Sequence, residues 1–259
     1  MVSVFLPLAA LGAALADGPR GVVEALPGGS IDWSRLVLTV TVQSDQRVGA
    51  WMDRRLQEQD AMDRMGPQVQ ALAARVRVTP DTLAADVLAG DSELSRRVAD
   101  TISSWTVVET RYHEAGAVEL SAELDLRRWL RPVLVSLAST GATPVGSGQA
   151  TGLLIDARGL PFEPCLVPRI TTASGAVLFG AQRLSAEPLA SESPVVYVTD
   201  PADEAAVRRA GERPILVRAA SVVRGGELVL DPEAGRRVED SPDLAAIAAQ
   251  GRVVVVVDP

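Results

Sequence analysis

Two amino acids are missing from this chain, and the absence of one of them, lysine, excludes two classes of chemistry. The sequence of 259 residues has no lysine and no asparagine, so all 25 residues of the lysine-plus-arginine class are arginines. Without lysine there is no Walker-type phosphate loop, because that loop needs its lysine on the terminal phosphates of a nucleotide. Schiff-base chemistry is excluded for the same reason, including that of pyridoxal phosphate enzymes.

Cysteine and histidine occur once each, as Cys165 and His113. A single cysteine rules out a disulfide within the chain, and the pair cannot supply the four ligands of a structural zinc site. We interpret Cys165 as a small buried residue and His113 as an outward-facing strand residue, and no G-x-S-x-G nucleophile motif is present. The sequence therefore predicts no catalytic residue, no metal site and no cofactor, and we expect the protein not to be an enzyme.

The chain is acidic overall, and aromatic residues are scarce. The net charge is -8, and aromatic residues make up 3% of the chain. Binding to nucleic acid depends on neutralising phosphates and on stacking bases, so we expect no nucleic-acid partner. No apolar run reaches the ~20 residues that a membrane-spanning helix needs, so we also expect no integral membrane span.

The N-terminal segment has the pattern of a secretory signal peptide. Residues 1–16 are apolar and end in Ala14-Leu15-Ala16, an A-x-A cleavage pattern, although no arginine precedes the apolar run. The alternative is a buried N-terminal helix or strand. No cysteine stands at the end of this segment, where Asp17 follows Ala16, so lipid attachment at a mature N-terminal cysteine is excluded. We expect a periplasmic protein that is exported and not lipid-anchored.

The next segments change from turn-rich to strand and then to helix. Residues 17–30 are rich in glycine and proline, and we expect an irregular lead-in. Residues 36–44 alternate between apolar and polar positions, which predicts a half-buried strand. Residues 46–76 carry apolar side chains at spacings of three or four, which indicates a helix. We expect Gly66-Pro67 to kink or split that helix, because proline removes a hydrogen bond of the helix.

The remainder of the first half predicts two short helices, a β-hairpin and a further helix. In the second hairpin strand, alternate positions are apolar and the others are charged, so one sheet face meets water or a partner. The predicted elements are a helix opened by Thr79-Pro80-Asp81, a helix over residues 94–104 capped by Asp91, strands over residues 106–114 and 118–126, and a helix over residues 127–137. We expect residues 31–139 to form an α+β domain with a strand-helix-strand-strand layer.

A run of small and polar residues without periodicity, residues 140–152, is the predicted linker. Its glycines do not form a dinucleotide loop, because the third glycine is misplaced and a strand follows. Short strands are predicted over residues 153–156, 176–179, 195–198, 215–218, 227–230 and 253–257, with helices opened by Asp200-Pro201 and Ser241-Pro242. We therefore expect residues 153–259 to form a second small α+β domain.

The most site-like cluster pairs Asp156 with Arg158 at the end of a predicted strand. A carboxylate beside an arginine can hold a functional group, but such a pair more often anchors a turn as a structural ion pair. Nothing nearby completes a catalytic mechanism. Asp156 and Arg158 are therefore candidate binding residues only.

A family resemblance adds to these observations. It rests on Gly29-Ser30-Ile31-Asp32-Trp33, on the amphipathic helix that follows and on the hairpin ending Gly116-Ala117-Val118-Glu119-Leu120. In these segments the chain resembles the lipoprotein-20 family of bacterial envelope proteins. The resemblance covers residues 29–138 and implies a compact domain that self-assembles or docks on envelope structures, including flagellar ones. It implies no catalytic residues, and this chain lacks the lipid-attachment cysteine of the lipidated members.

Three hypotheses of function remain. The first is a periplasmic structural or assembly protein that binds protein partners in the cell envelope and forms homo-oligomers. The second is a ligand-binding module with a pocket between the two domains near Asp156 and Arg158, because domain junctions often hold pockets. The third is a glycan hydrolase with two facing carboxylates, about 5 to 9.5 Å apart. The missing chemistry and the resemblance favour the first.

Overall fold

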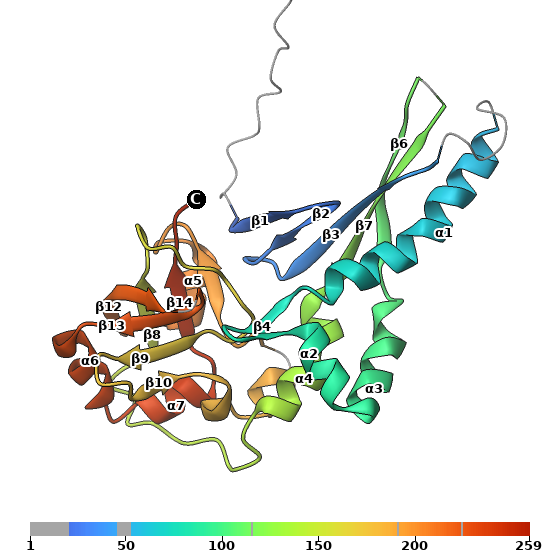
Figure 1. The fold of residues 1–259 in the computed structure, drawn as a ribbon. Coiled ribbons are helices and arrows are strands. Elements are labelled where there is room, and N and C mark those ends of the chain that lie inside the picture. Colours follow the sequence, from blue (N-terminus) through green and yellow to red (C-terminus); the bar gives the residue numbers. More distant parts are fainter. Residues whose placement is uncertain (1–20, 46–52, 115, 191, 224) are drawn as a thin grey trace, which may run out of the picture.

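The computed structural model describes residues 21–45, 53–114, 116–190, 192–223 and 225–259. These residues form two large β-sheets with helices packed on them and one two-stranded sheet, which confirms the predicted α+β class (Figure 1). One large sheet belongs to a first half of the chain, residues 21–139, and the other to a second half, residues 152–259. The predicted signal peptide lies outside the described residues.

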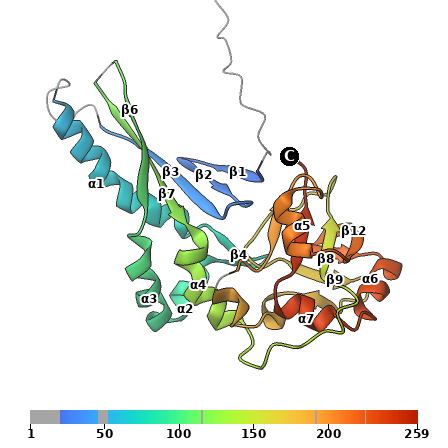
Figure 2. The same cartoon turned by 180° about the vertical axis from the view of Figure 1, so that it is seen from behind.

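The sheet of the first half has five antiparallel strands in the order β1-β2-β3-β7-β6. The strands are β1 (Val23–Leu26), β2 (Gly29–Asp32), β3 (Val37–Gln43), β6 (Thr106–Tyr112) and β7 (Val118–Asp125). The predicted strand and hairpin are confirmed. In β7, buried apolar residues alternate with partly exposed or exposed polar ones, as expected. Seen from behind, β6 and β7 extend together beyond the rest of the sheet (Figure 2).

Strands β1 and β2 correct the prediction of an irregular lead-in over residues 17–30. They form a hairpin whose turn contains Gly28, with a φ of 85° that an L side chain rarely adopts. Gly29 lies so close to the backbone of β3 that an added Cβ would fall 2.2 Å from the Thr39 carbonyl oxygen. The two glycines that indicated a loop are therefore needed for another reason: Gly28 for the tight turn and Gly29 for the close approach of two strands.

Helix α1 (Arg54–Ala73) lies across the sheet and is capped by Asp53, whose side chain accepts from two backbone N–H groups. Its buried face, which includes Met65 and Val69, packs on β3 and β7. The predicted split at Gly66-Pro67 is wrong, because the helix continues through both residues. Pro67 is exposed, so the carbonyl group that loses its helical partner lies on the side that water reaches.

Five more elements complete the first half: four connect α1 to the hairpin of β6 and β7, and one helix follows the hairpin. They are β4 (Arg77–Thr79), β5 (Thr82–Leu83), α2 (Ala84–Gly90), α3 (Ser92–Ile102) and, after β7, α4 (Leu126–Leu137). Asp91 caps α3 as predicted. The prediction that Thr79-Pro80-Asp81 opens a helix is wrong. Thr79 ends strand β4, which pairs with β5 across a turn at Pro80 and Asp81.

The sheet of the second half has seven strands in the order β10-β9-β13-β12-β8-β14-β11. The strands are β8 (Gly152–Asp156), β9 (Arg169–Thr172), β10 (Val177–Phe179), β11 (Val196–Val198), β12 (Pro214–Val223), β13 (Glu227–Leu230) and β14 (Val253–Val256). The helices are α5 (Glu204–Ala210), α6 (Pro232–Glu239) and α7 (Leu244–Ala249), with 3-10 turns η1 (Ala181–Arg183) and η2 (Pro188–Ala190).

Strands β12, β8, β14 and β11 run parallel, so their carboxyl ends share one edge of the sheet. The valines of β14 are fully buried, which confirms the prediction of a strand covered on both faces. Val253 and Val255 join the main core, whereas Val254 and Val256 pack with residues of α5 on the other face. Helix α5 covers β11 and β14 and reaches β8.

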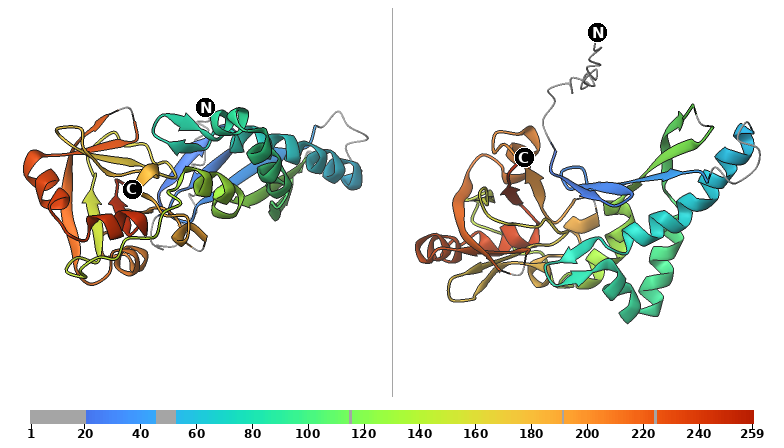
Figure 3. Two further views of the ribbon diagram at one scale, coloured as in Figure 1. Left: turned by 90° about the horizontal axis from the view of Figure 1, so that it is seen from below. Right: turned by 45° about the horizontal axis from the view of Figure 1, so that its top comes forward.

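The two halves lie side by side (Figure 3) and share one hydrophobic core. The backbone of β4 receives hydrogen bonds from the second half, from Leu166 N to Arg77 O at 3.0 Å and from Val167 N to Val78 O at 2.9 Å. The predicted linker is irregular over residues 140–151, and Asp243 of the second half accepts hydrogen bonds from its backbone. The junction is thus a packed contact, and the end of the linker is held in place.

Candidate functional site

The sequence-predicted pair forms a fork-like ion pair at the carboxyl end of β8. Arg158 Nε lies 2.9 Å from Asp156 Oδ1, and Arg158 Nη2 lies 2.8 Å from Asp156 Oδ2. The hydrogen bond from the Arg158 side chain is the main cause that lowers the pKa of Asp156. Asp156 is therefore ionised at neutral pH and does not suit the role of a general acid, which needs a raised pKa.

This pair lines a pocket of about 460 Å³ at the shared edge of the parallel strands. The lining residues are Leu154, Asp156, Arg158, Pro201, Leu216, Val217, Arg218, Asp231, Glu233, Ala234, Arg237 and Val256. All of them belong to the second half. Asp156 and Arg158 therefore line a pocket within the second half, rather than the expected pocket at the domain junction.

The pocket has an apolar floor and a charged rim. Leu216 is 59% exposed on its strand and lies beside Leu154 in the lining. Arg237 of α6 donates a hydrogen bond to the carbonyl oxygen of Leu216. Leu216 belongs to the part of β12 that pairs with β8. An apolar floor with opposite charges on its rim can receive a small amphipathic group, but it brings no reactive pair together.

A second cavity, of about 910 Å³, lies between the two halves. Ser34 and Arg127 of the first half line it together with residues of the linker and of the second half. Four arginines and three glutamates contribute to its wall, and they come from distant positions between residues 127 and 252. The sequence reasoning missed these residues because no local motif links them. Their excess of arginine becomes visible only when the fold brings them together.

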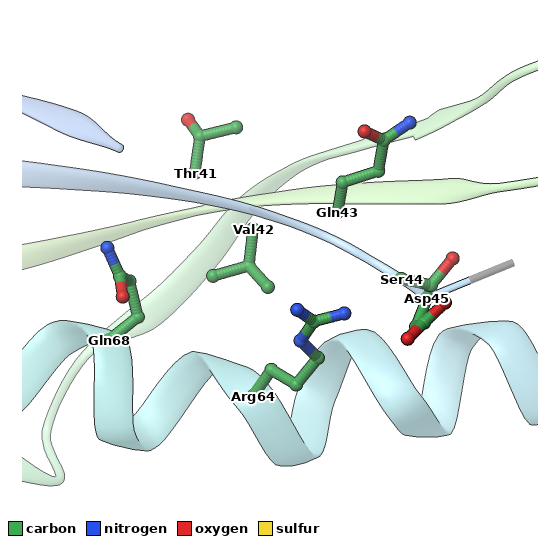
Figure 4. Close-up of a pocket in the computed structure, with 7 residues that line it drawn as sticks. All are labelled: Thr41, Val42, Gln43, Ser44, Asp45, Arg64 and Gln68. Carbon is green, nitrogen blue, oxygen red and sulfur yellow. The ribbon is translucent and has the colours of Figure 1, made fainter. Parts of the chain in front are cut away.

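A third hollow, of about 640 Å³, lies between β3 and α1 (Figure 4). Arg64 and Gln68 rise from α1 toward the strand, whereas Thr41 and Gln43 point to the opposite face of β3. Strand β2 begins at Gly29, opposite Val40, so the residues of β3 after Val40 pair only with β7 among the described strands. The hollow is an open surface groove rather than an enclosed site.

The edge strand β6 is the most exposed strand of the first half. It pairs with β7 on one side and with no other described strand. Val108 and Tyr112 are 53% and 52% exposed. The Tyr112 hydroxyl donates to Glu58 of α1 at 2.7 Å, and the Arg54 guanidinium lies 5.2 Å from its ring centroid. Helix α1 therefore supports the projecting hairpin on one face.

Cys165 and His113, the one possible thiol nucleophile and the one possible histidine base, each have a structural environment. Cys165 is buried, and burial raises the pKa of its thiol to about 12. His113 follows β6, with its Nε2 3.7 Å from a carboxylate oxygen of Glu119. Among the described residues, no three His, Cys, Asp or Glu side chains are grouped so as to hold a metal ion. In the same ranges, no helix is long and apolar enough to cross a bilayer.

Comparison with known proteins gives one family match and no match to a curated protein. The match covers residues 152–259 and begins at the first residue of β8, where the predicted linker ends. It includes the whole pocket around Asp156 and Arg158 and no residue of 29–138, so the lipoprotein-20 resemblance stays a prediction. The second half of this chain is similar to the family described as the second domain of Treponema pallidum Tp0624.

Proposed function

We propose that this protein is a non-catalytic structural or assembly protein of the bacterial cell envelope that self-associates along strand β6. The observation that carries the proposal is the exposed edge of β6 on a hairpin that projects from the body of the fold (Figure 1). An edge strand offers a row of backbone N–H and C=O groups to another strand. The partner of this edge is a second copy of the same chain.

The charges of β6 fit antiparallel pairing with its own copy. The strand is regular from Glu109 to Tyr112, because its register shift lies between Val107 and Glu109. A two-fold axis at Thr110 would place Glu109 of each copy opposite Arg111 of the other. Such cross-strand pairs of opposite charge stabilise a sheet by about 0.2–1 kcal/mol each. The pairing would join two five-stranded sheets into one continuous sheet.

The site of action is proposed from the sequence features. The predicted signal peptide supports export to the periplasm, and the resemblance of residues 29–138 to the lipoprotein-20 family supports an envelope structure as the setting. That family includes flagellar assembly proteins, so a flagellum-associated complex is one such setting. The chain would act there through protein–protein contacts, with β6 as the contact between copies.

The test is the oligomeric state of the purified chain, measured by light scattering during size exclusion. The wild type is expected to elute as a dimer or larger oligomer, and R111E is expected to weaken self-association at least about tenfold, because it puts glutamates opposite each other. R96E is the control, since Arg96 is an exposed residue of α3 away from the hairpin. A monomeric wild type, or an R111E variant that associates like R96E, would overturn the proposal.

A second candidate function is the binding of a small ligand at the junction of the halves. It is favoured by the junction cavity of about 910 Å³. Its supporting residues are the arginines of that cavity rather than Asp156 and Arg158. This candidate is independent of β6, because the strand does not line the cavity.

A further inference from the structure

The junction cavity concentrates arginines in a chain whose net charge is -8. Its lining residues are Ser34, Arg127, Thr143, Thr151, Glu187, Pro188, Glu192, Ser193, Val196, Ala205, Arg208, Arg209, Gly211, Glu212, Gln250 and Arg252. Helix α5 supplies two of the arginines, the residue before β14 supplies one, and α4 of the first half supplies the fourth. A ligand in this cavity would touch both halves.

Arg209 is the fixed member of the cluster. Its side chain is 8% exposed, and its Nη1 lies 3.1 Å from a carboxylate oxygen of Glu192. Its Nη2 donates to the hydroxyl of Ser193 at 2.7 Å and also to the carbonyl oxygen of that residue. The guanidinium is therefore oriented by several contacts, and Glu192 balances its charge.

The charges of Arg208 and Arg252 are not balanced in the same way. Within the described part of the chain, Arg208 forms an ion pair only with Glu204, at 3.6 Å. Both side chains are largely exposed, so the pair contributes little. Arg252 forms no ion pair with any described residue. Both side chains lie near enough to Arg209 for their charges to lower its pKa, after the larger effect of burial. Three guanidinium groups thus belong to the cavity lining, and Glu192 is the lining carboxylate that forms an ion pair with one of them.

The other charges of the cavity limit what it can hold. Glu187 accepts a hydrogen bond from the Thr143 hydroxyl at 3.5 Å, and Glu212 also lies in the lining. These carboxylates would repel a long polyanion that filled the cavity. Arg127 pairs with Asp125 at 3.4 Å on an exposed surface, a contact that an incoming anion can replace.

We propose that the junction cavity binds a small anion with one or more carboxylate or phosphate groups, held by Arg208, Arg209 and Arg252, with Arg127 contributed by the first half. Guanidinium groups donate paired N–H bonds that match the two oxygens of a carboxylate or phosphate. The buried and oriented Arg209 gives the site a fixed geometry, and the less constrained Arg208 and Arg252 supply the free charge. The proposal does not depend on the pairing of β6.

The test is calorimetric titration of the full chain with citrate in one arm and inorganic phosphate in the other. Saturable binding of either probe is expected, and the stronger arm identifies the preferred acidic group. R252Q and R208Q are each expected to weaken that binding about tenfold or more, because each removes a charge-assisted hydrogen bond. Both residues lie at the surface of the cavity, so their loss is not expected to unfold the chain.

R96Q is the matched control, because it removes an exposed arginine that does not line the cavity. Its affinity for the probe should equal that of the wild type at the same ionic strength. Circular dichroism of each variant shows whether it is folded, and R127Q tests the contribution of the first half. No saturable binding to the wild type, or equal binding by R252Q, R208Q and R96Q, would overturn the proposal.

Discussion

Trp33 and Tyr197 meet edge to face across the junction of the two halves, with ring centroids 6.3 Å apart and ring planes at 74°. Both side chains are buried. The Tyr197 hydroxyl donates to the Cys165 carbonyl oxygen at 2.7 Å and accepts from the Cys165 N–H at 3.3 Å. The tyrosine therefore joins the first half to the segment before β9 by packing and by hydrogen bonds.

The first prediction concerns that hydroxyl group. Y197F keeps the ring but leaves the buried backbone groups of Cys165 without their partner, so we expect a loss of about 1–3 kcal/mol in the free energy of unfolding. Urea unfolding measures it. The control is Y112F, whose hydroxyl pairs with Glu58 on an exposed surface and should cost much less. Equal stability of Y197F and wild type would contradict this account of the junction.

The second prediction concerns the pH dependence that Cys165 gives to stability. Burial raises the pKa of its thiol from 9.0 to about 12, so the folded chain keeps a proton that the unfolded chain loses between these values. This contribution to stability is complete below pH 9 and falls by about 1.4 kcal/mol per pH unit as the pH rises toward 12. Urea unfolding of C165A, compared with wild type at pH 8 and pH 10, isolates the effect. The native thiol should also react far more slowly with a thiol reagent than the unfolded one.

The third prediction concerns the ion pair of β8. R158Q removes the hydrogen bond that lowers the pKa of Asp156, so that pKa should rise toward its ordinary value of 3.8. A lowered pKa stabilises the fold at neutral pH, and that contribution is lost as the pH falls through the folded-state value. Because Arg158 is exposed, we expect only a small loss in the free energy of unfolding at pH 7. An NMR titration of the Asp156 carboxyl group measures the shift, and an unchanged titration would contradict the assignment.

The fourth prediction concerns the linker. Asp243 accepts hydrogen bonds from Ala150 N at 2.6 Å and Gly148 N at 2.9 Å, and these bonds lower its pKa. D243A should therefore raise the hydrogen-exchange rates of these two amides, while amides inside β14 keep theirs. Acidification of the wild type through the folded-state pKa of Asp243 should also weaken the protection of these two amides from exchange. Unchanged exchange at Gly148 and Ala150 in D243A would mean that other contacts hold the linker.

Sequence patterns predicted elements whose signals are local. Strands β3 and β7 were predicted from alternation, and α3 from its cap at Asp91. Strand β9 was missed because its four residues, Arg-Ile-Thr-Thr, have no apolar alternation, and α6 was missed although Asp231-Pro232 is a typical helix start. The Asp156–Arg158 pair was found because its members are two residues apart. The junction arginines are spread over the chain, so only tertiary packing brings them into one cavity.

The most direct test of self-association along β6 mixes two variants that fail alone. E109R presents arginines at both charged positions of the edge, and R111E presents glutamates at both. Each variant alone should be largely monomeric in sedimentation velocity, because like charges face each other across the two-fold axis. An equimolar mixture should form a heterodimer, since each arginine then faces a glutamate of the other copy. A mixture that stays monomeric while the wild type is dimeric would contradict this pairing, and so would single variants that remain dimeric.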